Sequence, residues 1–169
     1  GDLVMVELTR QPQRKRRPQG EVVEVLGAEV TTALEIDLVL RKFDIPALWD
    51  QGVAAEIDRL PGQPGTRDLE ADSGLPRVDL RELPLVTIDG EDARDFDDAV
   101  CLVPHGKGMR LYVAVADVSH YVKPGRPLDE EARQRGTSAY FTDRVIPMLP
   151  ERLSNGLCSL NPDVDRLVM

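Results

Sequence analysis

The chain has 169 residues, of which 41% are hydrophobic and 30% charged, so it is expected to fold, and a disordered protein is excluded. It has no run of about 18 apolar residues that could span a bilayer and no signal-peptide pattern, so we expect a cytoplasmic protein with no membrane partner. The net charge of −9 by itself argues against a nucleic-acid partner.

Charge is unevenly distributed along the sequence. The range from Arg10 to Arg17 holds five basic residues and no acid, whereas the range from Pro61 to Asp98 holds eleven carboxylates and four arginines. The net charge is therefore a poor guide to binding. The basic range predicts either a solvated loop, which we favour, or a loop that adds contacts to phosphates.

The N-terminal residues predict a β-hairpin. An apolar run, interrupted only by Glu7, extends from Leu3 to Leu8, and a second apolar run extends from Glu21 to Leu26. Two strands are not stable alone. We therefore interpret residues 1–27 as the end of a β-barrel or as an edge hairpin that rests on the next part of the chain.

An amphipathic helix is expected from Thr32 onward. Apolar residues recur at helical spacing as far as Phe43, Thr32 and Glu35 have the spacing of a capping box, and Pro46 follows the last turn. The pattern predicts that Thr32 caps this helix.

A second helix is expected from Asp50 to Leu60, because apolar residues again recur on one face. Residues 28–60 thus predict a helical connector. The polar, acidic residues 66–83 predict an extended linker that runs over the surface.

Strands are expected in the second half of the chain. Residues 83–88 predict a buried strand that ends at Asp89, and two apolar runs, Ala99–Val103 and Met109–Ala116, predict an antiparallel hairpin. The second of these runs is apolar on both faces, which is typical of a central strand.

The remaining elements alternate helix and strand. A helix is expected after Pro127, with acids in its first turn, arginines in its last turn and Gly136 as its stop. A short strand is expected through Tyr140. Cys101 and Cys158 lack the spacing of a zinc or disulfide motif and are interpreted as core residues.

The range from Asp89 to Asp98 contains the strongest chemical signal. Seven of its ten residues are ionisable, and six of those are acids. Repulsion at this density must be offset by a cation or by raised pKa values. Carboxylate oxygens suit Mg²⁺ or Mn²⁺, and a site with few ligands leaves positions for water and phosphate. Four of these acids are placed to converge: Asp89, Asp95, Asp97 and Asp98.

An acidic surface loop without a metal is the alternative, and composition alone makes the two about equally plausible. The apolar flanking runs and Phe96 within the cluster favour the metal site. An EF-hand is excluded, because Ala99, Val100 and Gly106 occupy positions that such a loop gives to a ligand, a glycine and a glutamate.

Four segments in order resemble a known family. They are TIDGEDARDFDDAV (87–100), LYVAVADVSHYV (111–122), RGTSAYF (135–141) and IPMLPERLSNGLCSLNP (146–162). Together they resemble the start of the catalytic domain of the ribonuclease II/ribonuclease R family, and they are most similar to its bacterial ribonuclease R members. Residues 1–27 are similar to the last strands of the cold-shock (OB-fold) domain that precedes that catalytic domain.

The resemblance implies an α+β fold in three parts: an OB-fold hairpin over residues 1–27, a helical connector and acidic linker over 28–83, and the N-terminal part of the mixed α/β catalytic domain over 84–169. It also implies that the chain is a fragment, because the family's phosphate-clamping arginines and its S1-type domain would come later in the sequence. We expect the fragment alone to be inactive or nearly so, and its exposed edges to favour association.

The resemblance further implies a hydrolytic exoribonuclease that degrades single-stranded RNA from the 3′ end to nucleoside 5′-monophosphates with Mg²⁺, or with Mn²⁺. Asp89, Asp95, Asp97 and Asp98 match the family's four acids, with Asp97 the most critical for cleavage. Tyr140 matches an aromatic residue that stacks on a base, whereas the residue pattern alone equally predicts a buried strand tyrosine.

The same motifs support two further interpretations. Asp117 and the pair His120-Tyr121 are expected to be structural. A non-catalytic RNA-binding or scaffolding module remains the rival function, and binding of Mg²⁺ or Mn²⁺ distinguishes it from the nuclease.

Overall fold

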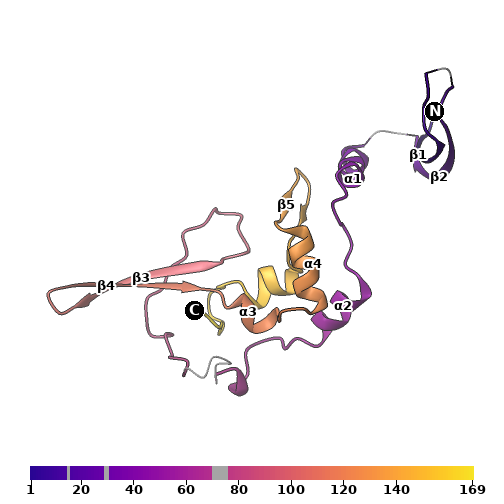
Figure 1. The fold of residues 1–169 in the computed structure, drawn as a ribbon. Helices are drawn as coiled ribbons and strands as arrows, with labels where there is room; N and C mark the ends of the chain where they lie inside the picture. The colour runs from indigo at the N-terminus through magenta and orange to yellow at the C-terminus, as the bar shows by residue number, and fades with distance from the viewer. Residues whose placement is uncertain (15, 29–30, 70–75) are drawn as a thin grey trace. The chain divides into compact units, whose positions relative to one another are not determined.

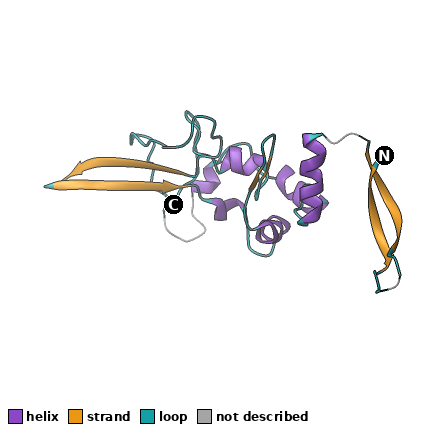
Figure 2. Cartoon of the chain, turned by 90° about the horizontal axis from the view of Figure 1, so that it is seen from above, coloured by secondary structure: helices purple, strands orange, loops and turns teal. Residues whose placement is uncertain are grey.

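The computed structural model describes residues 1–14, 16–28, 31–69 and 76–169, and these form the expected α+β fold. The chain divides into two compact units. Unit 1 comprises Gly1–Ala47 with Phe141–Asp143, and unit 2 comprises Leu48–Tyr140 with Arg144–Met169. The elements of each unit can be followed along the chain in Figure 1, and by type in Figure 2.

Unit 1 contains the expected hairpin and helix. Strands β1 (Leu3–Arg10) and β2 (Gln19–Gly27) pair antiparallel, with irregularities in their register. Helix α1 (Thr32–Lys42) comes next. The prediction that Thr32 caps this helix is wrong by one residue. The hydroxyl of Thr31 accepts a hydrogen bond from the Leu34 amide, because Thr31 is the last residue with extended backbone.

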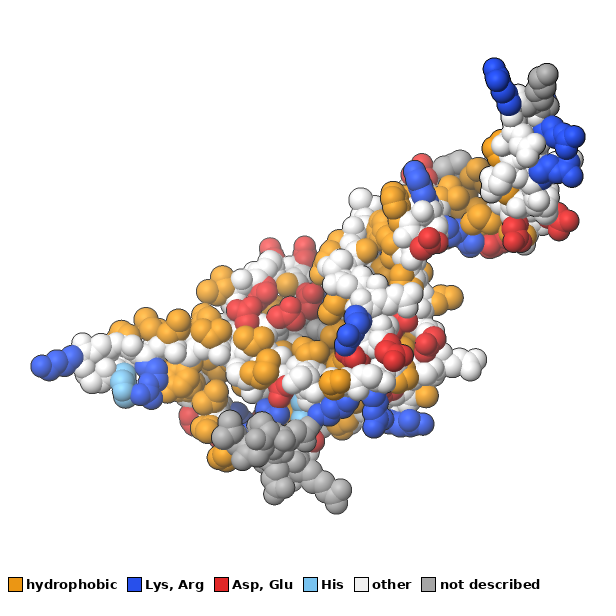
Figure 3. All heavy atoms as spheres, viewed as in Figure 1, with side chains coloured by type: hydrophobic (Ala, Val, Ile, Leu, Met, Phe, Trp, Pro, Cys, Tyr) orange, Lys and Arg blue, Asp and Glu red, His pale blue; other side chains and the backbone are white. Residues whose placement is uncertain are grey.

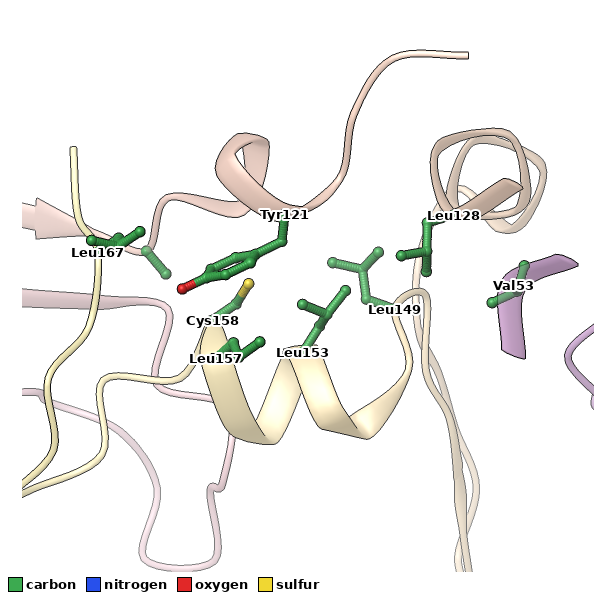
Figure 4. Close-up of a cluster of buried hydrophobic side chains, with 9 residues drawn as sticks. Val53, Tyr121, Leu128, Leu149, Leu153, Leu157, Cys158 and Leu167 are labelled. Atoms are coloured by element: carbon green, nitrogen blue, oxygen red, sulfur yellow. The ribbon is translucent and has the colours of Figure 1, made fainter. Parts of the chain in front are cut away.

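Unit 2 is built around a hydrophobic core between short helices. Helices α2 (Gln51–Asp58), α3 (Val118–Tyr121) and α4 (Pro127–Arg135) contribute to it, together with a π-helical turn, η2 (Arg152–Leu157). Figure 4 shows the buried side chains that these elements bring together. Val53, Leu128 and Leu153 lie in this core, each with at most 1% of its surface exposed.

The ends of α2 and α4 agree with the sequence. The Asp50 carboxylate accepts a hydrogen bond from the Val53 amide at 2.7 Å, which caps α2. Gly136 ends α4 with a φ of 72°, a left-handed conformation that glycine adopts without strain.

Arg135 does more than complement the dipole of α4. Its side chain is almost fully buried and pairs with Glu131, while its guanidinium lies 3.5 Å from the ring centroid of Trp49. It also donates to the carbonyls of Leu48 and Pro147. This one side chain therefore links α4 to the residues before α2 and after β6 (Val145–Ile146).

The predicted hairpin in the second half is present and longer than expected. Strands β3 (Asp98–His105) and β4 (Gly108–Val115) pair in register, and a tight turn with Gly106 at φ 59° joins them. The prediction that the second strand is central is met only at its end, where Val115 exchanges backbone hydrogen bonds with Met169 on the edge away from β3. Among the described residues its sheet has only these two strands, and the apolar side chains of one face remain exposed: Leu102, Met109, Leu111, Val113 and Val115.

The predicted buried strand over residues 83–88 is also wrong. Only Val86 pairs, through a single bridge to Val100, and the Ile88 side chain is 84% exposed. The acidic linker is more structured than expected, because Thr66–Leu69 forms a 3₁₀ turn, η1, and Arg77 is anchored to Asp117. Of the linker, residues 70–75 lie outside the described ranges.

The remaining expectations concern Tyr140 and the cysteines. Strand β5 (Ala139–Tyr140) pairs with β6 in a two-residue ladder. Cys101 and Cys158 are both buried free thiols, as expected of core residues, and burial raises the pKa of Cys158 to about 12. In the part of the chain that the structure describes, no helix has the length and apolar character needed to cross a membrane.

Candidate functional site

The acidic loop, residues 89–98, lies between the Val86 bridge and the start of β3. Its first part turns through a hydrogen bond from the Ala93 amide to the Gly90 carbonyl. Asp98 is the first residue of β3 and opposes Val115. Figure 3 shows acidic side chains gathered beside the inner end of the β3–β4 hairpin. The loop is thus placed by a bridge on one side and a hairpin on the other.

The four predicted aspartates differ in exposure. Asp95 is half-buried, whereas Asp89, Asp97 and Asp98 are exposed. The backbone that carries them is fixed: the Asp97 carbonyl accepts from the Ala116 amide at 2.8 Å. The side chains can therefore meet water or a ligand while their Cα positions remain defined.

Asp97 lies at the electrostatic centre of the loop. Partial loss of hydration raises the pKa of its carboxyl, and the negative charges of Asp95, Asp98 and Asp89 raise it further, in that order. The three predicted partners are thus near enough to Asp97 to repel its charge. A cation among them would relieve that repulsion.

The four carboxylates have the right chemistry to bind a metal ion, but their arrangement in space suits a metal ion less well. Carboxylate oxygens are the hard ligands that Mg²⁺ and Mn²⁺ prefer. Among the described residues, however, no group of three or more His, Cys, Asp or Glu side chains is arranged to hold a metal ion. The four aspartates are neighbours without forming a closed ligand set, and the metal site remains a prediction.

Tyr140 lies beside the aspartates. Its side chain is 69% exposed, which excludes the buried strand tyrosine that the residue pattern also allowed. Its hydroxyl is 3.4 Å from Asp95 Oδ2, which is long for a hydrogen bond and shows proximity more than a strong interaction. An exposed aromatic ring and the acidic loop therefore adjoin, although 45 positions separate Tyr140 from Asp95 in sequence.

Asp117 and His120 have the structural roles that the sequence suggested. Asp117 is buried, caps α3 by accepting from the His120 amide, and forms an ion pair with Arg77 at 2.6 Å. Burial would raise the pKa of Asp117, but hydrogen bonds from Arg77 and Ser119 outweigh it and lower the pKa below its usual value. The His120 ring lies 3.2 Å from Asp68.

Tyr121 belongs to the core and not to the site. Its ring is buried, and burial raises the pKa of its hydroxyl to about 12. Figure 4 shows this ring extending toward Cys158 from α3. A tyrosine next to a histidine within a motif is here a packing residue.

Sequence reasoning missed two residues, one that anchors Asp117 and one that holds the acidic loop. Arg77 anchors Asp117 from 40 positions away, and Ser159 contacts the acidic loop from 63 and 65 positions away. Ser159 lies within the fourth matching segment, which was the only signal available for it. A cavity of about 1220 Å³ is lined in part by Arg77 and Asp117, but none of the four aspartates borders it.

Comparison with known families gives two matches. The family model described as RNB domain matches residues 77–169, and the model described as Cold shock domain matches residues 1–50. The first covers the acidic loop, Tyr140 and Ser159. The second covers the β1–β2 hairpin and α1.

Curated proteins and solved structures give the same relationship. Ribonuclease R of Escherichia coli (strain K12) is 58% identical over 100% of this chain, and the match covers 20% of that protein. A structure of Mycoplasma genitalium RNase R with double-stranded RNA covers 99% of this chain and 29% of that one, with a TM-score of 0.86 and 31% identity. A structure of the same enzyme with ribose methylated single-stranded RNA has a TM-score of 0.85 and 31% identity, covering 98% of this chain and 25% of that one. The chain thus spans about a fifth of the length of the curated relative.

Proposed function

This chain belongs to the RNB domain family, and all of its residues align with part of ribonuclease R. We propose that it contributes the aspartate-bearing part of a hydrolytic 3′-to-5′ exoribonuclease. The substrate is single-stranded RNA, and the products are nucleoside 5′-monophosphates. Cys101 and Cys158 are both free thiols, which suits action in the reducing cytoplasm.

The observation that carries the proposal is the meeting of two separate motifs. Tyr140 presents an exposed ring, and its hydroxyl is 3.4 Å from a carboxylate oxygen of Asp95. Aromatic rings bind single-stranded RNA by stacking on bases, each worth about 1–3 kcal/mol. Carboxylates beside such a ring are suited to hold a cation that would receive the phosphate next to the stacked base.

In this mechanism, the carboxylates of Asp89, Asp95, Asp97 and Asp98 would hold the metal. When bound, Mg²⁺ would supply Lewis-acid polarisation of the phosphate and would lower the pKa of water. Tyr140 orients the terminal nucleotide by stacking, and its position beside Asp95 sets where the chain end stops. Hydrogen bonds to the backbone of Arg94, Phe96 and Asp97 hold the part of the loop that carries Asp95 and Asp97.

Metal binding provides the first test. We expect wild-type protein to bind Mn²⁺, and the double variant Asp97→Asn with Asp98→Asn to lose most of that binding, because half of the proposed ligands become neutral. Isothermal titration calorimetry measures the affinity. The matched control is Glu91→Gln with Asp92→Asn, which removes two charges from exposed residues of the same loop.

The control distinguishes the loss of specific metal ligands from a general loss of negative charge in the loop. Equal loss of Mn²⁺ affinity in both double variants would show only that the loop attracts cations, and would contradict the assigned ligand set. In a full-length exoribonuclease that contains this chain, Asp97→Asn is expected to abolish hydrolysis of a single-stranded RNA, while the protein still binds that RNA. We expect the 169-residue chain alone to be nearly inactive, because positioning groups supply much of the rate in phosphoryl chemistry.

A second candidate is a non-catalytic RNA-binding module. The observation in its favour is that the described side chains form no group able to hold a metal. This candidate predicts RNA binding that is indifferent to Mn²⁺ and to the Asp97→Asn change. The titration above therefore distinguishes it from the nuclease.

A further inference from the structure

Ser159 contacts the acidic loop although it lies outside it. It is fully buried, at 0% exposure, and comes shortly after η2. Its hydroxyl donates to the Arg94 carbonyl at 2.8 Å and accepts from the Phe96 amide at 3.0 Å. One side-chain oxygen thus spans the peptide groups on either side of Asp95.

The next residue continues this contact. The Leu160 amide donates to the Phe96 carbonyl at 2.9 Å. Ser159 and Leu160 therefore bind three successive backbone groups on one edge of the loop, as a neighbouring strand would. On the other edge, the Ala116 amide binds the Asp97 carbonyl. In such an extended segment alternate side chains share a face, so Asp95 and Asp97 are directed together while Phe96 is directed away.

A serine is suited to this position because a hydroxyl can donate and accept at the same time. Its other polar groups are also used: the Ser159 amide donates to the Gly156 carbonyl, and the Ser159 carbonyl accepts from Arg166 Nε at 2.8 Å. Ser159 is thus a fully bonded buried residue that is itself held in place. Alanine would fit the space but leave the Arg94 carbonyl and the Phe96 amide without this partner.

We infer that Ser159 is a positioning residue for the aspartate site: its hydroxyl fixes the backbone on both sides of Asp95, and so sets how Asp95 and Asp97 meet a divalent cation. This inference rests on the proposed function, because it assigns Ser159 a purpose only if that loop binds metal. It differs from a general packing role, since the hydroxyl contacts only the backbone of the loop.

Amide hydrogen exchange tests the tether without reference to activity. In Ser159→Ala we expect the Phe96 amide to exchange at least about tenfold faster, while the amides of Cys101 and Tyr112, which pair across the β3–β4 ladder, keep their wild-type rates. The matched control is Ser154→Ala, because the bond that the described residues show for the Ser154 hydroxyl is to the adjacent Asn155 side chain, at 3.3 Å. It should leave the Phe96 amide unchanged. Faster exchange throughout unit 2 in Ser159→Ala would overturn the inference in favour of a general core role.

Mn²⁺ titration of the same three proteins tests the consequence for the site. Ser159→Ala is expected to bind Mn²⁺ about tenfold more weakly than wild type, as residues that support metal ligands commonly do when removed, and Ser154→Ala is expected to bind normally. Equal affinity in wild type and Ser159→Ala would overturn the inference and leave the proposed function standing. No Mn²⁺ binding by wild type would overturn the proposed function, while the exchange rate of the Phe96 amide would still decide whether Ser159 holds the loop.

Discussion

At the scale of single residues, Asp117 shows how one buried carboxylate organises its surroundings. It caps α3, pairs with Arg77 and receives the Ser119 hydroxyl at 2.7 Å. Its own amide donates to the Leu167 carbonyl. Segments from three parts of the sequence therefore meet at this residue, and its charge is balanced by a guanidinium with little exposure to water.

The lowered pKa of Asp117 predicts how stability depends on pH. Because the folded state favours its ionised form, its contribution is fully present above the ordinary carboxyl pKa of 3.8 and is lost as pH falls through the lower folded value. At pH 7, Asp117→Asn should cost about 3 kcal/mol of unfolding free energy, since Arg77 loses its partner. The difference from wild type should shrink below about pH 4.

Urea unfolding at several pH values measures this effect, with the exposed Asp163→Asn as control for loss of one negative charge. Asp163 has a φ of 61°, which asparagine tolerates. A stability difference that stays constant down to about pH 3 would contradict the assigned role of the Asp117 charge.

The sequence indicated the candidate site residues more readily than the residues that support them. The acidic loop could be found because its residue types carry chemistry, whereas Tyr140 was identified through the family resemblance, and its exposure agrees with its expected use. Arg77 and Ser159 could not be found, since nothing local distinguishes an arginine or serine that will contact a residue 40 or 63 positions away.

At the scale of elements, the core between the helices and η2 carries the stability of unit 2. Leu153 is completely buried within η2, and Leu128 and Val53 face the same core from α4 and α2. Hydrophobic spacing and end signals predicted α2 and α4 because both are local. The prediction of a strand over residues 83–88 was wrong, because hydrophobic periodicity does not reveal whether a neighbouring strand is available to pair with those residues.

Truncation of Leu153 tests the importance of this core. Leu153→Ala should lower the unfolding free energy by about 2–5 kcal/mol, because a buried side chain is replaced by a cavity. Leu48→Ala, the same change at an 85% exposed residue of unit 2, should alter it by less than about 0.5 kcal/mol. Urea denaturation followed by circular dichroism gives both values, and similar costs for the two variants would contradict the assignment of the core.

At the scale of the whole molecule, exposed apolar surface is the main liability. One face of the β3–β4 hairpin presents Leu102 and Leu111 directly opposite each other, 57% and 60% exposed, and Figure 3 shows apolar side chains along this hairpin. A two-stranded sheet has unpaired edges that can template association. The chain should therefore associate as its concentration rises.

Substitutions that place opposite charges on facing residues test which hairpin causes association. Leu102→Glu with Leu111→Lys places opposite charges on facing residues, so it should reduce association without loss of the hairpin. Val4→Glu with Val25→Lys is the matched control on β1–β2, where these residues also face each other. Sedimentation velocity measures the outcome, and monomerisation by the control pair alone would show that association occurs through the other hairpin.

The contacts that hold the acidic loop also determine when it can form. Ser159 meets the loop across 63 and 65 positions, and the Asp117 amide binds the carbonyl of Leu167. A growing polypeptide that has just completed β4 therefore has all four aspartates of the acidic loop and none of their C-terminal partners. The cluster therefore acquires its final shape only after residues 159–167 have been made and folded back, and the acids remain a loose, hydrated stretch until then.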